Sequence, residues 1–132
     1  MKSRIELASS KLEDAMSIID VFCKNTFKDD KELCFGIRLV YEELMTNIFK
    51  HATKCNATKV DIELSLDSSN VSMRFSYNGD EFDPTSYKDK RIDEPFSINK
   101  KQGGLGLFLV SEFSNQFTYK RKNGLNIVDV KI

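Results

Sequence analysis

The chain has few of the residues that mark disulfide frameworks, metal sites and membrane spans. It holds one histidine, two prolines and three cysteines in 132 residues, and no stretch approaches the roughly 20 apolar residues of a membrane-spanning helix. The cysteines are odd in number and lack metal-type pairing. The first ten residues, MKSRIELASS, are charged and have no apolar leader segment. We therefore expect a cytoplasmic protein with no membrane partner.

An excess of charge of either sign is also missing. Lys plus Arg and Asp plus Glu number 20 each, so the formal net charge is zero. No overall field draws the chain to nucleic acid, and we expect no direct contact with it. With 40% hydrophobic residues and no linker or repeat, the chain is predicted to form a single domain over residues 1–132.

Hydrophobic periodicity predicts the order of the elements. Helical spacing follows Ser9 and Ser10, which we expect to cap a helix over residues 11–27, and a longer helix is predicted from residue 29 or 30 to 53. Its expected apolar stripe is Leu33, Ile37, Val40, Leu44 and Ile48. A third helix is predicted over GGLGLFLVSEF, with Leu105, Phe108, Leu109 and Phe113 inward.

Alternation with a period of two predicts the strands. A short strand is expected at residues 4–8, a hairpin over 60–66 and 71–77, and a second hairpin over 117–132 that turns at Asn123-Gly124. Residues 78–103 lose all periodicity and form a long loop, which inside a compact domain is usually functional or disordered. This order predicts the α+β class: a two-layer α/β sandwich with helices on one face of a mixed, mainly antiparallel sheet.

The segment YEELMTNIFKHA, residues 41–52, places polar side chains on the flank of the long helix. Glu43 and Asn47 lie one turn apart beside the apolar stripe. A partly desolvated carboxylate suits general-base catalysis, and an amide oxygen can bind a hard cation such as Mg²⁺. A solvated polar flank explains the same pattern. His51 falls within the stripe, so it is interpreted as a packed, hydrogen-bonded histidine.

Two further segments have both a structural and a functional interpretation. GGLG, residues 103–106, either ends a loop or lets backbone N–H groups approach a phosphate at a helix start. Neither a Walker loop nor a dinucleotide fingerprint fits it. Lys100 and Lys101 precede it and could assist with phosphate charge. YNGDEFDP, residues 77–84, has turn signals at Asn78-Gly79 and Asp83-Pro84.

Together, EELMTNIFKHA, NGDEFDP and GGLGLFLV resemble in order the N box and two glycine boxes of the histidine-kinase-like ATPases, the Bergerat fold. Within that superfamily the chain looks most like the small anti-sigma-factor serine kinases. The match spans residues 43–110, and the flanking element order agrees with it.

The resemblance implies ATP and Mg²⁺ as cofactors and assigns roles by position. Glu43 would be the general base that activates the attacking hydroxyl, and Asn47 the Mg²⁺ ligand. Gly79 would let the backbone pass the adenine, and residues 85–102 would form a lid. The other residues implied at the nucleotide site are Tyr77, Phe82, Lys101, Gly103, Gly104, Leu105 and Gly106.

The chain departs from the family pattern at Tyr77, where the family has the adenine-reading Asp. Strand alternation places Tyr77 on the inward face and Asn78 away from it. A buried tyrosine could stack on a base or fill the pocket. Weak ATP binding with reduced preference for adenine is therefore expected.

Two functions remain open at this point. The first is an anti-sigma-factor-type regulator that binds ATP, phosphorylates a serine on a small antagonist domain and sequesters a sigma factor, as a homodimer by resemblance. The second is a degenerate adaptor that keeps the fold for protein binding with weak or no ATP binding. A sensor-kinase catalytic domain fits poorly, because no helix carries a phosphoacceptor histidine.

Overall fold

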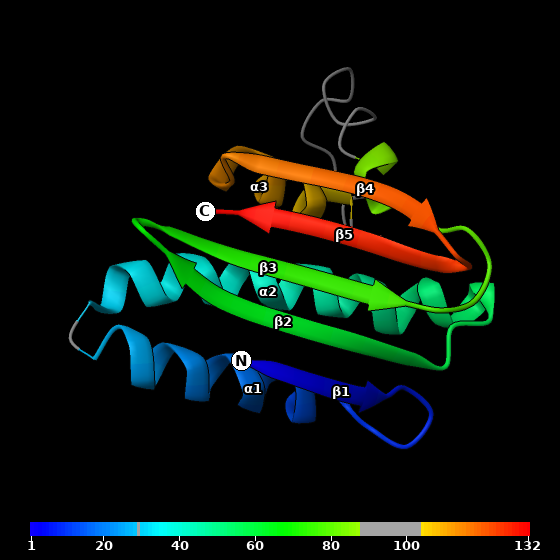
Figure 1. Cartoon of the computed structure of the whole chain (residues 1–132), viewed down its shortest axis with the longest axis horizontal. Coiled ribbons are helices and arrows are strands. Elements are labelled where there is room, and N and C mark those ends of the chain that lie inside the picture. The colour runs from blue at the N-terminus through cyan, green and yellow to red at the C-terminus, as the bar shows by residue number, and fades with distance from the viewer. Residues whose placement is uncertain (29, 88–103) are drawn as a thin grey trace.

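The computed structural model describes residues 1–28, 30–87 and 104–132 (Figure 1). Its strands are β1 (Lys2–Glu6), β2 (Lys59–Asp67), β3 (Asn70–Tyr77), β4 (Gln116–Lys122) and β5 (Leu125–Lys131). Its helices are α1 (Leu12–Thr26), α2 (Lys31–Lys50) and α3 (Gly104–Phe113), with the short 3-10 turns η1 (Ala52–Cys55) and η2 (Pro84–Tyr87).

The strands form one five-stranded sheet in the order β1-β2-β3-β5-β4. All four pairings between these strands are antiparallel, so the parallel component allowed for in a mixed sheet is not found in the described part of the chain. Asn123 and Gly124 both have positive φ, 54° and 77°, as a tight hairpin turn requires. The predicted second hairpin is confirmed.

The three helices cover one face of the sheet and lie behind it in Figure 1. The reason is visible in the strands, where buried and less buried residues alternate: Val60, Ile62 and Leu64 on β2, and Val71, Met73, Phe75 and Tyr77 on β3, face the core. A sheet with one apolar face needs a single helical layer to bury it. The predicted two-layer α/β sandwich is confirmed.

The long helix α2 is the centre of the helical layer. The Asp30 carboxylate accepts a hydrogen bond from the Leu33 backbone N–H at 3.1 Å and so caps its start. Four residues of the predicted stripe are buried, namely Ile37, Val40, Leu44 and Ile48. Leu33 is 37% exposed, contrary to the prediction, because it lies in the first turn of the helix, at the edge of the layer.

The start of α1 also differs from the sequence prediction. Its N-cap is Lys11 rather than Ser9 or Ser10, and the Asp14 carboxylate accepts a hydrogen bond from the Lys11 backbone N–H at 2.7 Å. The free backbone N–H at the start of the helix is therefore satisfied by a carboxylate three residues farther along. Farther along, the Tyr41 hydroxyl on α2 donates to the Ala15 carbonyl oxygen at 2.6 Å and joins the two helices.

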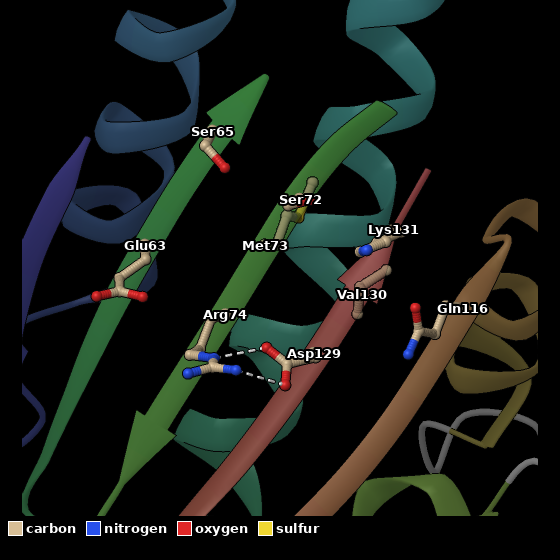
Figure 2. Close-up of a pocket in the computed structure, with 9 residues that line it drawn as sticks. All are labelled: Glu63, Ser65, Ser72, Met73, Arg74, Gln116, Asp129, Val130 and Lys131. Atoms are coloured by element: carbon tan, nitrogen blue, oxygen red, sulfur yellow. Dashed lines mark hydrogen bonds and ion pairs between the residues drawn. The ribbon is translucent and has the colours of Figure 1, made fainter. Parts of the chain in front are cut away.

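The open face of the sheet carries ion pairs. Figure 2 shows Arg74 on β3 donating two hydrogen bonds to Asp129 on β5, at 2.7 and 3.1 Å. These residues border a shallow hollow of about 360 Å³ that also includes Glu63, Ser65 and Lys131. The hollow lies on the side of the sheet opposite the helices and is separate from the predicted nucleotide site.

Cys23, Cys34 and Cys55 are free thiols. Within residues 1–28, 30–87 and 104–132, none of the helices has both the length and the apolar character needed to span a membrane.

Candidate functional site

Glu43 and Asn47 lie on successive turns of α2, as the sequence predicted. Asn47 is only 6% exposed, and its Nδ2 has no hydrogen-bond partner among the described residues. A buried donor without an acceptor costs about 1–3 kcal/mol. A ligand that carries oxygen atoms, such as a phosphate or a coordinated water, would supply the missing acceptor. This is the only described buried side-chain nitrogen or oxygen in that state.

Glu43 is partly buried, and its electrostatic environment favours the protonated form. Burial raises the pKa of its carboxyl group above the usual range, and the neighbouring charge of Glu42 raises that pKa further. A carboxylate with a raised pKa is a stronger base once it is ionised. The environment of Glu43 is therefore suited to accepting a proton from a hydroxyl group.

The raised pKa of Glu43 predicts a pH-dependent stability difference in Glu43→Gln. The folded state binds this proton more tightly than the unfolded chain, so its contribution to stability is present at acidic pH and lost as pH rises through the raised pKa. Glu43→Gln should match the wild type at acidic pH and exceed it at neutral pH. The gain should stay below about 1 kcal/mol, because solvent screens a partly exposed group. Denaturant unfolding across the pH range measures it.

Glu42→Gln is the matched control for that measurement. It removes the charge of Glu42 but leaves Glu43 partly buried, so only the smaller of the two causes of the raised pKa is relieved. The gain in unfolding free energy at neutral pH should therefore be smaller than in Glu43→Gln. Equal stability of Glu43→Gln and wild type at every pH would contradict the prediction.

His51 packs at the end of α2, in agreement with its interpretation from the sequence. Its backbone N–H donates to the Asn47 carbonyl oxygen at 2.8 Å, and its ring centroid lies 6.0 Å from that of Phe82. Burial lowers the pKa of the imidazole, and the charges of Lys50 and Lys54 lower it further. A neutral imidazole at neutral pH follows, which suits a packing role.

Tyr77 is buried at the end of β3 and points inward, as predicted. Its hydroxyl donates to the Phe82 carbonyl oxygen at 2.6 Å, and the two ring centroids are 6.5 Å apart. Burial is the main cause of the strongly raised pKa of this hydroxyl, which therefore stays neutral. Tyr77 thus occupies the inward position where the resemblance predicts base recognition, and its hydroxyl already has an acceptor.

Gly79 lies in the turn after β3 and has a φ of +92°. A Cβ atom there would lie 2.5 Å from the Cys55 carbonyl oxygen and 2.6 Å from the Ala57 backbone nitrogen. The next residue, Asp80, donates its N–H to the same Cys55 oxygen at 2.6 Å. The described reason for a glycine is therefore contact with the backbone between η1 and β2, whereas passage of an adenine remains a prediction.

Neighbouring side chains hold the same turn. The Asn78 side chain points away from the core, as expected, and its Oδ1 accepts from the Thr58 N–H at 2.8 Å and the Lys59 N–H at 3.2 Å. Beyond the turn, Asp83 Oδ1 accepts from the Thr85 N–H at 2.9 Å and so caps η2. The predicted turn signals at both ends of YNGDEFDP are confirmed.

Asn126 on β5 is a buried polar residue that sequence reasoning missed. Its Nδ2 donates to the carbonyl oxygens of Tyr77, Asn78 and Asp80, and its Oδ1 accepts from the Phe82 N–H. The signal was present in LNIVDV, where one asparagine occupies an inward position in register with Val128 and Val130. A lone amide on an apolar strand face requires buried partners.

The glycine-rich segment is described only from Gly104, where α3 begins. Residues 88–103 lie outside the described residues, and they include Lys101, Gly103 and most of the expected lid. The side chains of Leu105 and Phe108 are also outside the described part of the chain. Among the described side chains of α3, Leu107 and Val110 are buried, whereas Phe113 is 54% exposed, although it was predicted to face inward. Phe113 is the last residue of the helix, where the protein no longer covers it.

The described residues fit Mg-ATP at one end of the site only. Asn47 lacks an acceptor that a phosphate group or a Mg²⁺-bound water could provide. No group of three or more His, Cys, Asp or Glu side chains forms a metal cluster in the described part of the chain. One protein ligand together with phosphate oxygens and waters is a usual environment for Mg²⁺. At the predicted base end, position 77 carries a phenol hydroxyl bonded to Phe82 in place of a carboxylate.

Comparisons with known proteins agree with the motifs and the fold. Residues 5–132 match the family described as the histidine kinase-like ATPase domain. Serine-protein kinase RsbW of Staphylococcus aureus strain MRSA252 is 30% identical over 95 residues. That alignment covers 68% of this chain and 60% of RsbW, so the chain spans less than two thirds of this relative.

Two solved structures share the fold at low sequence identity. A chain in the crystal structure of the SiaB-SiaC complex from Pseudomonas aeruginosa superposes with a TM-score of 0.66 and 11% sequence identity. The match covers 99% of this chain and 88% of the matched chain. A nucleotide-free form of the catalytic domain of histidine kinase ThkA superposes with a TM-score of 0.52 and 13% sequence identity. That match covers 100% of this chain and 96% of the ThkA chain. The family match over nearly the whole length and the shared fold lead to one conclusion: this chain belongs to the histidine kinase-like ATPase domain family.

Proposed function

We propose that this protein is a cytoplasmic regulator of the anti-sigma-factor type that binds Mg-ATP and phosphorylates a serine on a small antagonist domain. The observation that carries the proposal is the pair on α2, a carboxyl with a raised pKa one turn before a buried amide whose Nδ2 has no acceptor among the described residues. The similarity to a protein named as a serine-protein kinase supports the substrate class.

Each residue would have a separate task in this reaction. Asn47 would hold Mg²⁺ through its side-chain oxygen, and Mg²⁺ neutralises phosphate charge when bound. Glu43 would accept the proton of the serine hydroxyl, and the glycines at the start of α3 would leave backbone N–H groups free for phosphate oxygens. Phosphoryl transfer depends mainly on such positioning and charge neutralisation.

The partners of the proposed regulator are a sigma factor and a small antagonist domain, and the proposed assembly is a homodimer. These proposals rest on the resemblance to anti-sigma-factor kinases. Size-exclusion chromatography with light scattering measures the assembly directly, and a monomeric mass would contradict the homodimer.

Calorimetric titration with Mg-ATP tests the proposed function. Saturable binding that requires Mg²⁺, followed by phosphate transfer to a serine of an antagonist domain, is the expected result. Binding that is absent both with and without Mg²⁺ would contradict a nucleotide-dependent activity.

Tyr77 supports a second candidate, an adaptor that keeps the fold for protein binding with weak or no ATP binding. Its hydroxyl donates to the Phe82 carbonyl oxygen, and its ring would occupy the base side of the proposed site. Partner binding that is equally tight with and without Mg-ATP would favour the adaptor.

The substitution Tyr77→Asp should tighten ATP binding by about tenfold to a hundredfold. It would restore a charged acceptor for the adenine amino group, and a hydrogen bond to a charged group contributes about 1.5–3 kcal/mol. The ATP and GTP dissociation constants of both proteins measure the effect and its base preference. Thermal unfolding must accompany them, because a smaller side chain leaves a cavity. Tight, adenine-selective binding by the wild type would show that another group recognises the base.

A further inference from the structure

One carboxamide holds the turn after β3 closed without a ligand. Asn126 Nδ2 donates to three carbonyl oxygens of the turn, those of Tyr77 at 3.3 Å, Asn78 at 3.4 Å and Asp80 at 3.1 Å. Its Oδ1 accepts from the Phe82 N–H at 3.1 Å. Both ends of the turn are thus bonded to one fully buried side chain on β5.

Strand β4 fixes the orientation of this carboxamide. The Tyr119 hydroxyl and the Arg121 Nη1 also donate to Asn126 Oδ1, at 2.6 and 3.1 Å. With donors on one side and carbonyl acceptors on the other, only one orientation of the amide satisfies every group. Arg121 adds a direct bond to the turn, since its Nη2 donates to the Gly79 carbonyl oxygen at 3.0 Å.

The closed turn encloses the Tyr77 side chain. The Phe82 N–H is bonded to Asn126, and the Phe82 carbonyl oxygen accepts from the Tyr77 hydroxyl at 2.6 Å. Both backbone groups of Phe82 are therefore engaged within the chain. A base placed in the space of the Tyr77 ring would require the Tyr77 hydroxyl to leave the Phe82 carbonyl oxygen, and that movement would strain the bonds that Asn126 makes to the same turn.

We infer that Asn126 is a positioning residue that keeps the base side of the nucleotide site closed, and that a nucleotide base enters only when this clamp releases the turn. With the clamp closed, the site takes a Mg²⁺-bound polyphosphate and makes no use of a base. The identity of the ligand rests on the proposed function, whereas the closed turn is a property of the ligand-free protein.

Asn126→Asp tests the clamp with little change of shape. It keeps the acceptor oxygen and replaces the donor with an oxygen that faces three carbonyl oxygens. Asn115→Asp is the matched control, because Asn115 is exposed and lies outside the turn. Tyr77→Phe is the second variant if Asn126→Asp fails to fold, since it removes only the hydroxyl that bonds Phe82.

Hydrogen exchange measured by NMR without nucleotide is the first readout. The Phe82 amide donates to Asn126 itself, and the Asp80 amide, in the same turn, donates to the Cys55 carbonyl oxygen, so both should exchange slowly in the wild type and in Asn115→Asp. In Asn126→Asp their exchange should be about tenfold faster or more, equivalent to about 1.4 kcal/mol of opening free energy. Fast exchange in the wild type would overturn the clamp.

The second readout is the ratio of the dissociation constants for Mg-tripolyphosphate and Mg-ATP, which isolates the contribution of the base. The wild type should bind both probes with similar affinity. Asn126→Asp should tighten Mg-ATP about tenfold, or about 1.4 kcal/mol, and leave Mg-tripolyphosphate unchanged. Tyr77→Phe should shift the ratio in the same direction.

A purely structural role for Asn126 gives a different result. The variants would then lower thermal stability without changing that ratio, which would overturn the inference, as would a wild type that binds Mg-ATP much more tightly than Mg-tripolyphosphate. If no variant binds either probe, the proposed function fails, and the exchange rates alone test the clamp. Slow amide exchange in the wild type that becomes faster in Asn126→Asp supports the clamp. Equal exchange rates in the two proteins overturn it.

Discussion

Glu43→Ala is expected to reduce phosphate transfer by about 10²–10⁴-fold, the usual contribution of a general base, while Mg-ATP affinity stays nearly unchanged. A base acts in the chemical step, so its loss leaves the bound ground state intact. Asn47→Ala should weaken Mg²⁺-dependent binding as well, because a metal ligand contributes to the ground state too. Single-turnover transfer rates and calorimetric titration of both variants separate the two roles.

The control for this pair is Glu42→Ala, on the same turn of α2. Glu42 lies 3.6 Å from Arg38 in an exposed ion pair, which contributes little to stability. It should retain both transfer and binding. Equal losses of binding in Glu43→Ala and Asn47→Ala would indicate that Glu43 is structural and that the proposed division of labour is wrong.

Gly79→Ala is expected to destabilise the fold by about 3 kcal/mol or more, through backbone strain and a steric clash together. At a φ of +92° any side chain is strained, and the new Cβ would lie within 2.6 Å of backbone atoms of Cys55 and Ala57. The two backbones would have to separate, which breaks the Asp80 N–H bond to Cys55. Denaturant unfolding measures the free-energy change.

Two other glycines serve as matched controls for the two causes. Gly124 has a φ of +77° but open space around its Cβ direction, so Gly124→Ala should cost only the strain, about 1–2 kcal/mol. Gly36 lies within α2 with nothing nearby, so Gly36→Ala should stabilise by about 1 kcal/mol. A Gly79→Ala effect no larger than that of Gly124→Ala would contradict the close backbone approach.

Prediction from the sequence succeeded where the cause is local. Alternation on β2 and β3 predicted which residues face the helices, because successive strand side chains point to opposite faces. Helical spacing likewise predicted the buried centre of α2 and the one-turn separation of Glu43 and Asn47. It failed at Leu33 and Phe113, because periodicity gives the face of a residue but not whether a neighbour covers that end of the helix.

By itself, the sequence determined the elements, their order, the inward position of Tyr77 and the set of motifs that placed the chain in its family. Only the tertiary structure decided what those residues contact: Asn126 bonds the turn from β5, Gly79 lies against the backbone of η1, and the Asn47 Nδ2 has no acceptor in the described part of the chain. The physical reason is distance along the chain. Asn126 and the Asp80 carbonyl that it bonds are 46 residues apart, and periodicity cannot report a contact of that length, because it records only the face on which each partner lies.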